Sequence, residues 1–126
     1  MVERWFAAVE DRDADALVAM CSAGVEIRPF LARQTPDAAT YAGHDGVRRW
    51  VASLDRLTRI TLDLHAIEIT SPRSAVVEAE VWFELEGART GGMTWSVWRF
   101  DNGKLSEAVG YGSKQDALDA EAGGWH

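Results

Sequence analysis

Residues 77–87 read Val-Glu-Ala-Glu-Val-Trp-Phe-Glu-Leu-Glu-Gly. The odd-numbered side chains from Val77 to Leu85 are all apolar. Of the five even-numbered side chains from Glu78 to Glu86, four are glutamates. Because successive side chains of a β-strand point to opposite faces, this alternation predicts a strand with one face against a core. Gly87 is expected to end it.

The strand pattern continues on both sides of this stretch. Downstream, residues 92–100 and 104–112 predict two strands joined at Asp101-Asn102-Gly103, since Asn-Gly accepts the positive φ angles of a tight hairpin turn. Upstream, apolar residues alternate from Ile60 to Ile69, with a phase slip at His65-Ala66 that predicts a β-bulge.

The first half of the chain predicts helices. Apolar residues recur at helical spacing in three segments, which comprise Val2, Trp5, Phe6 and Val9; Leu17, Met20 and Cys21; and Val47, Trp50, Val51 and Leu54. Asp13 is the expected N-cap of the second helix, and Ala23-Gly24 its expected end. A short strand from Val25 to Arg28 should stop at Pro29, followed by a loop over residues 30–42.

Helices followed by long antiparallel strands predict an α+β fold with the helices on one face of a bent sheet. The 126 residues contain no repeat or linker and are expected to form one domain over 1–126, with residues 114–126 as a terminal helix or tail.

Composition narrows the class of protein. The net charge of −7 with scattered basic residues argues against nucleic-acid binding, and no apolar run is long enough to span a membrane. The start lacks the pattern of a signal peptide, and the single Cys21 fits a core position in a reducing compartment, so we expect a cytoplasmic protein.

Two motifs carry a family resemblance: Tyr41-Ala-Gly-His-Asp-Gly-Val-Arg-Arg-Trp50 and Trp98-Arg-Phe-Asp-Asn-Gly-Lys-Leu105. With the order of elements, they resemble the SnoaL-like, ketosteroid-isomerase-like branch of the nuclear transport factor 2-like superfamily. The resemblance implies a cystatin-like cone whose curved, mostly antiparallel sheet encloses a small-molecule pocket. The ligand-binding positions it implies are Trp5, Tyr41, Trp50, Ala79, Val81, Phe83, Thr94, Ser96, Trp98, Ala108 and Gly110.

The acid/base residues of known branches do not carry over onto this sequence. The position of the steroid-isomerase base is Arg28 here, and its two oxyanion-binding positions are Trp5 and Ser96. Ala108 and Gly110 occupy the inward positions where the polyketide cyclases have His or Asp, and carboxylates matching the epoxide hydrolases are not found. Fold alone does not choose between these activities.

Glu26 and Arg28 are the candidate catalytic pair, because residues two apart on a strand share a face. If that face lines the pocket, they could act in proton transfer, or Arg28 could bind a ligand carboxylate. Simple alternation favours the opposite phase, with Val25 and Ile27 in the core.

The other polar candidates have simpler interpretations. Asp45 after His44 suits a helix start, and Asp63 with His65 suits an exposed polar edge, with an acid/base dyad as the alternative. The histidines lack paired ligand spacing, so neither a metal nor a cofactor is expected. The outward sheet face is apolar and predicts a homodimer interface, formed by Trp82, Trp95, Val97, Val109 and Tyr111.

Two functional hypotheses follow. The first is a pocket protein for an apolar or aromatic metabolite, with cofactor-independent acid/base chemistry of isomerase, cyclase or dehydratase type. The second is a non-catalytic ligand carrier or dimerisation module of the same fold. A carboxylate or histidine in the pocket would favour the enzyme, and an apolar pocket the carrier.

Overall fold

The computed structural model describes residues 1–29 and 40–123. The first helix, α1 (Val2–Glu10), buries Val2, Trp5 and Val9 along one face, as their helical spacing predicts. Asp13 caps α2 (Ala14–Ala19) because its side chain accepts a hydrogen bond from the Ala16 backbone N–H at 3.1 Å. The predicted N-cap is therefore confirmed.

The third helix, α3 (Gly43–Ser53), continues into a short 3-10 helix, η2 (Leu54–Arg56). Val47 and Val51 are buried along α3, and Leu54 is buried at the start of η2. These helices therefore pack one apolar face against the sheet. Trp50 of α3 packs against the same core.

Six strands form a single sheet in the order β2-β1-β6-β5-β4-β3. Their bounds are Cys21–Arg28 for β1, Tyr41–Ala42 for β2, Arg59–Ser71 for β3, Ser74–Leu85 for β4, Ala88–Asp101 for β5 and Lys104–Tyr111 for β6. Every pairing is antiparallel except that of β1 with β6, so the predicted mostly antiparallel sheet is confirmed.

Turn and bulge residues lie where the sequence predicts them. Asn102 and Gly103 have φ angles of 51° and 77° between β5 and β6, and Glu86 and Gly87 have 52° and 83° between β4 and β5. The register of β3 against β4 shifts between Leu64 and Ala66, which confirms the bulge. The bulge returns the apolar residues after it to the inner face.

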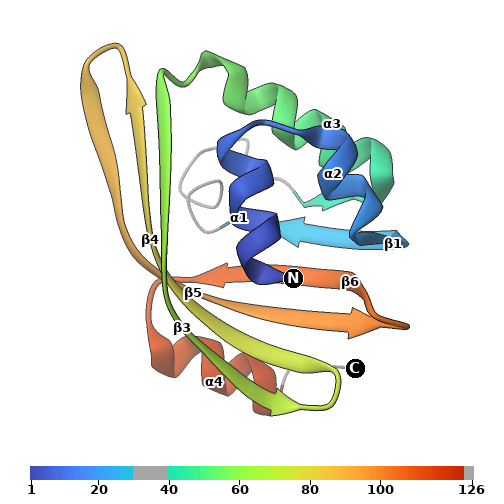
Figure 1. Cartoon of the computed structure of the whole chain (residues 1–126). Helices are drawn as coiled ribbons and strands as arrows, with labels where there is room; N and C mark the ends of the chain where they lie inside the picture. Colours follow the sequence, from blue (N-terminus) through green and yellow to red (C-terminus); the bar gives the residue numbers. More distant parts are fainter. Residues whose placement is uncertain (30–39, 124–126) are drawn as a thin grey trace.

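Helices cover both faces of the sheet (Figure 1). In the view shown, α1, α2 and α3 lie together over the inner face, and the main core between them and the sheet includes Trp5, Val25 and Trp98. The last helix, α4 (Lys114–Gly123), lies apart from them, and its Ala117 packs with Val76 and Val97 in a second, smaller core. The predicted α+β cone is therefore the observed architecture.

The strand β1 departs from the sequence-based expectation. Ala23 and Gly24 do not end a helix but lie within β1, which starts at Cys21. Cys21 pairs with Leu105 of β6, and the pairing resumes at Glu26, so Ala23 and Gly24 lie in an irregular stretch between these two points. Most of the loop expected over residues 30–42 lies outside the described residues, and its end, Tyr41–Ala42, pairs with β1 as β2.

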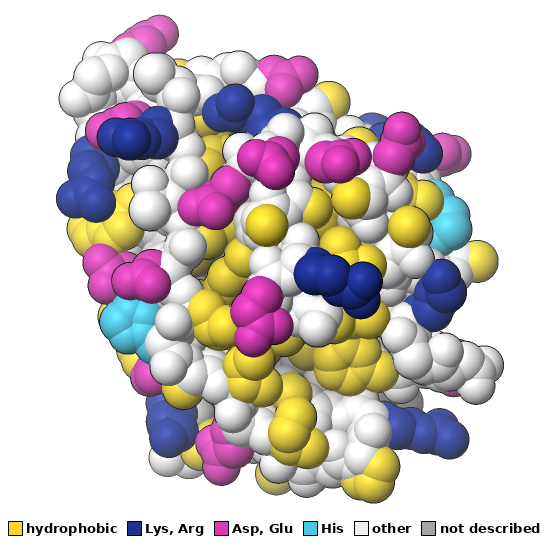
Figure 2. Space-filling view, viewed as in Figure 1, with side chains coloured by type: hydrophobic (Ala, Val, Ile, Leu, Met, Phe, Trp, Pro, Cys, Tyr) yellow, Lys and Arg dark blue, Asp and Glu magenta, His cyan; other side chains and the backbone are white. Residues whose placement is uncertain are grey.

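Surface charge and hydropathy agree with the composition. Among the side chains drawn in Figure 2, acidic and basic groups are interspersed over the face shown, and the basic ones form no continuous stripe. Within residues 1–29 and 40–123, no helix has both the length and the hydropathy that crossing a membrane requires.

Candidate ligand pocket

A pocket lies between the inner face of the sheet and the helices α1 and α3. It is a partly open cavity of about 130 Å³. Its lining comprises Trp5, Phe6, Val9, Ile27, Arg28, Pro29, Trp50, Leu54, Leu62, Ala79, Val81, Phe83, Thr94, Ser96, Trp98, Ala108 and Gly110. Nearly all of these side chains are apolar, so the space favours an apolar ligand.

Strand alternation explains how the sheet builds its wall of the pocket. Register places Ser96 opposite Gly110 and Trp98 opposite Ala108, so the neighbouring strands turn these residues to the same face. Small residues on β6 stand beside a hydroxyl and an indole on β5. The small side chains leave the space that the tryptophan and the helices enclose.

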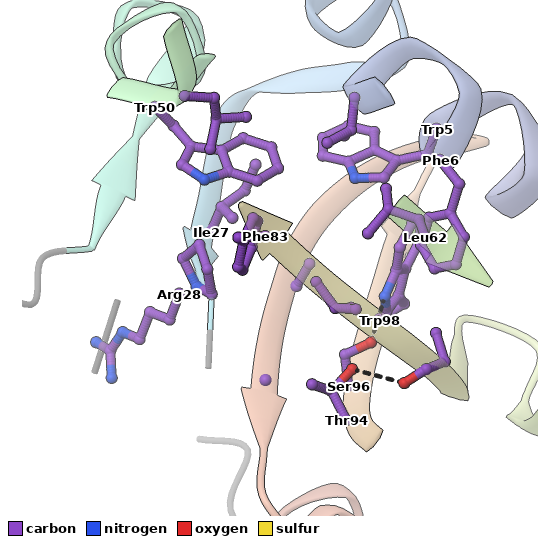
Figure 3. Close-up of a pocket in the computed structure, with 17 residues that line it drawn as sticks. Trp5, Phe6, Ile27, Arg28, Trp50, Leu62, Phe83, Thr94, Ser96 and Trp98 are labelled. Carbon is purple, nitrogen blue, oxygen red and sulfur yellow. Dashed lines mark hydrogen bonds between the residues drawn. The ribbon is translucent and has the colours of Figure 1, made fainter. Parts of the chain in front are cut away.

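Aromatic rings form the opposite wall (Figure 3). Trp5 of α1 stacks on Trp50 of α3 with ring centroids 6.1 Å apart, and it meets the edge of Trp98 at 5.7 Å. Phe6 contacts Trp98 edge to face at 6.5 Å. These contacts stabilise the packing of the rings, because offset and edge-to-face pairs are the favoured arrangements of aromatic rings.

Two hydroxyl groups are the polar features inside the pocket. The Trp98 indole N–H donates to the Ser96 hydroxyl oxygen at 2.9 Å, and the Thr94 hydroxyl donates to the Ala79 carbonyl at 3.2 Å. Since Ser96 accepts the indole bond, its own hydroxyl hydrogen remains free to be donated to a ligand oxygen or nitrogen. Ser96 can therefore orient a ligand that carries one acceptor group.

Most of the residues singled out from the sequence line this pocket. Ten of the eleven predicted ligand-binding residues do so, whereas Tyr41 packs half-buried against the core on β2 and is not part of the lining. Sequence reasoning missed Phe6, Val9, Ile27, Pro29, Leu54 and Leu62. The helical spacing of Phe6 and Val9 with Trp5, and the alternation through Leu62, are the signals that could have identified three of them.

The phase of β1 separates Glu26 from the pocket. Val25 and Ile27 are buried, whereas Glu26 is exposed and does not line the pocket. The inward orientation on which a catalytic role of Glu26 depended is therefore not found. Arg28, at the end of β1, contributes to the rim, and Figure 3 shows its guanidinium pointing away from the aromatic rings.

The pocket lining contains a charged side chain, Arg28. Among the residues that the structure describes, Arg28 is the one ionisable side chain that lines it, with no carboxylate or histidine. Trp5, Arg28 and Ser96, which the family resemblance matches to the acid/base positions of the steroid isomerases, all line the pocket. Their geometry matches the resemblance, but their side chains do not supply a general base near neutral pH.

The outer sheet face is partly covered within the chain. α4 packs over Val97, which is fully buried, and partly over Trp95 and Tyr111. The prediction that this entire face contacts a second copy therefore needs correction for Val97 and Val109, because both are buried within the chain, Val97 against Ala117.

Fold and pocket together define an α+β cone protein with a small-molecule pocket. The chain belongs to the SnoaL-like domain family, whose model matches residues 2–108. No match is found among curated proteins.

Solved structures share the fold at low identity. A hypothetical protein with a ketosteroid isomerase-like fold from Catenulispora acidiphila, in complex with trimethylamine, is 18% identical, with a TM-score of 0.75 and coverage of 93% of this chain and 88% of that one. RV0760c from Mycobacterium tuberculosis, in complex with estradiol-17beta-hemisuccinate, is 16% identical (TM-score 0.74, coverage 90% and 92%). Delta 5-3-ketosteroid isomerase from Mycobacterium sp. is 14% identical (TM-score 0.73, coverage 92% of each chain).

Proposed function

We propose that this chain is a non-catalytic binding protein for a small, uncharged aromatic molecule with one hydrogen-bond acceptor. The observation that carries the proposal is the pocket lining: aromatic and aliphatic walls, two hydroxyl groups, and neither carboxylate nor histidine among the described residues. Such a lining stabilises an apolar ligand by burial and orients it through Ser96.

The size of the cavity supports a ligand of about one ring. An engineered apolar cavity of about 150 Å³ binds benzene, whereas drug-sized ligands occupy about 300 Å³ or more. At about 130 Å³ the space encloses a single ring. The fold does not set this size, since its solved relatives are found with ligands as different as trimethylamine and estradiol-17beta-hemisuccinate.

A small alkylammonium ion is the competing ligand, because five aromatic rings line the pocket and aromatic faces attract cations. Two features favour the neutral ligand. Trp5 and Trp50 stack on each other, so part of each ring face is already occupied. Arg28 also lines the pocket, and its positive charge disfavours a cationic ligand.

A thermal-shift series distinguishes these ligands, because a compound that binds the folded state raises the unfolding midpoint. We expect phenol to raise it more than a hydroxysteroid or tetramethylammonium does. Ser96→Ala should reduce the effect of phenol but not that of benzene. A larger shift with the steroid would contradict the size argument, and no shift with any compound would overturn the binding function.

We also propose that two copies pair through the part of the outer sheet face that α4 leaves uncovered, around Trp82. This indole is only partly buried, and the Arg89 guanidinium lies 4.1 Å from its ring centroid. Partly exposed aromatics on a sheet face support an interface between copies. Sedimentation of wild type and Trp82→Glu tests the proposal, and a monomeric wild type would contradict it.

A further inference from the structure

Three polar side chains meet on the outer face of the sheet, away from the pocket. His65 Nε2 lies 3.4 Å from Glu80 Oε1 and 3.7 Å from Asp63 Oδ2. One ligand atom from each of the three residues lies within 4.8 Å of the others. Two of these side chains come from β3, which is an edge strand of the sheet, and one comes from its neighbour β4 (Figure 1).

The bulge in β3 is what brings them together. Asp63 pairs directly with Glu80 across the two strands, and the register shifts between Leu64 and Ala66. His65 is the extra residue of this bulge, so it lies beside the Asp63–Glu80 pair on the same face. A bulge commonly redirects a side chain in this way, and all three side chains are held by strands rather than by a loop.

The carboxylates of Asp63 and Glu80 face each other across the two paired strands. Like charges directly opposite each other on paired strands destabilise a sheet. Among the described residues, His65 is the one basic group that approaches Asp63 or Glu80 within ion-pair distance. A cation bound between the two carboxylates would therefore offset their repulsion.

The two contacts of His65 are too long for hydrogen bonds and are close to the separation of ligand atoms around a metal ion. Nitrogen-to-oxygen hydrogen bonds span about 2.7–3.2 Å, and both contacts of His65 are longer. Ligand atoms about 2.1 Å from a tetrahedral zinc ion lie about 3.4 Å from one another. The Nε2–Oε1 distance of 3.4 Å equals this edge, and the Nε2–Oδ2 distance of 3.7 Å is close to it.

A neighbouring side chain already orients one ligand. The Trp82 indole N–H donates to Glu80 Oε2 at 2.6 Å, which leaves Oε1 directed toward His65. Hydrogen bonds from outer groups to ligating carboxylates are typical of metal sites and raise their affinity.

We propose that Asp63, His65 and Glu80 form a binding site for a divalent first-row transition metal such as Zn²⁺. One imidazole and two carboxylates suit zinc better than magnesium or calcium, which prefer all-oxygen ligands. Water completes the coordination, because Asp63 is 72% exposed and His65 is 39% exposed. The ion would link the edge strand β3 to β4, and the site is independent of the pocket and its ligand.

Calorimetric titration of the tag-free chain with ZnCl₂ tests the proposal. We expect one ion per chain, and at least tenfold weaker binding in His65→Gln, Asp63→Asn and Glu80→Gln. Trp82→Phe should weaken binding about tenfold through loss of its hydrogen bond to Glu80. His44→Gln and Glu84→Gln are the matched controls and should bind as the wild type does.

Circular dichroism of each variant checks folding, and the substitutions are expected to be tolerated because Asp63 and His65 are exposed. Co²⁺ gives a second readout, since its visible absorption changes when protein ligands replace water, and this change should be lost in His65→Gln. Equal zinc affinity of wild type and His65→Gln, or no binding to wild type, would overturn the proposal.

Discussion

Glu26 of β1 lies directly across from Glu107 of β6, on the sheet face opposite the pocket. Burial raises the pKa of the Glu107 carboxyl, and the negative charge of Glu26 raises it further, against the opposing effects of Arg99 and Arg28. The carboxyl groups of Glu26 and Glu107 therefore interact with each other on the outer face of the sheet and not in the pocket.

Glu26→Gln is expected to lower the pKa of Glu107, because it removes the second-largest cause of the rise. The folded state binds the Glu107 proton more tightly than the unfolded state does. Its contribution to stability is therefore present below the usual carboxyl range and is lost as pH rises above it. Carbon-13 NMR titration of the side-chain carboxyls measures the pKa, with Glu3→Gln as control. An unchanged Glu107 pKa in Glu26→Gln would contradict the coupling.

Cys21 makes the stability of the chain depend on pH in the alkaline range. Burial raises the pKa of the Cys21 thiol to about 11, and Lys104 lowers it in part. Since the folded chain retains the thiol proton, the free energy of unfolding should fall between pH 9 and 11, by roughly 2 kcal/mol. Denaturant titrations of wild type and Cys21→Val at both pH values test this. Parallel declines in the two proteins would contradict it.

Gly46 of α3 has no room for a side chain. A Cβ at this position would lie 2.8 Å from the backbone carbonyl carbon of Tyr41. Gly46→Ala should therefore push α3 away from β2 and lower the free energy of unfolding by about 1–3 kcal/mol, the range of overpacked cores. Gly24→Ala is the matched control, because no atom lies within 4 Å of its Cβ position. Urea denaturation compares the two, and equal stabilities would contradict this reading of the contact.

The lining of the pocket predicts that the wild type does not isomerise a Δ5-3-ketosteroid faster than buffer does. General acid/base catalysis typically contributes about 10²–10⁴-fold, and it requires a group of suitable pKa at the reacting atoms. Arg28→Ala should leave the rate unchanged, as measured by ultraviolet absorbance of the conjugated product. Turnover above buffer that is lost in Glu26→Gln would place that carboxylate in the reaction and contradict the binding function.

The sheet was predictable from the sequence because its alternation is long and regular. Residues 77–85 have one apolar side chain at every second position, and Asn102-Gly103 fits only a narrow set of turns. The bulge at His65 was predictable for the same reason, because the apolar alternation from Ile60 to Ile69 changes phase at this position. Each of these signals comes from residues that are close together in the sequence, so it can be identified without knowing which distant segments are in contact.

Features that depend on contacts between distant segments were not predictable. The start of β1 at Cys21 results from pairing with β6, which no property of Ala23 or Gly24 indicates. The cluster of Asp63, His65 and Glu80 requires the register of β3 against β4, so histidine spacing alone argued against a metal site. The outward orientation of Glu26, in contrast, is the one that simple alternation favours, with Val25 and Ile27 buried in the core.

The pocket walls were predictable mainly through the family resemblance. It placed Trp5, Trp98 and Ala108 around one space, and all three line it. The volume of the pocket could not be predicted from the resemblance. It depends on how closely the indole rings pack, as in the 6.1 Å separation of the Trp5 and Trp50 ring centroids.

Calorimetric titration with phenol of wild type and Ala108→Leu tests the central claim, that the cavity is a binding site. Ala108 lines the pocket, so the larger side chain should fill it and weaken phenol binding at least tenfold. Ala52→Leu, at an exposed position of α3, is the control and should bind as the wild type does. Phenol binding of equal strength in wild type and a folded Ala108→Leu would contradict the claim.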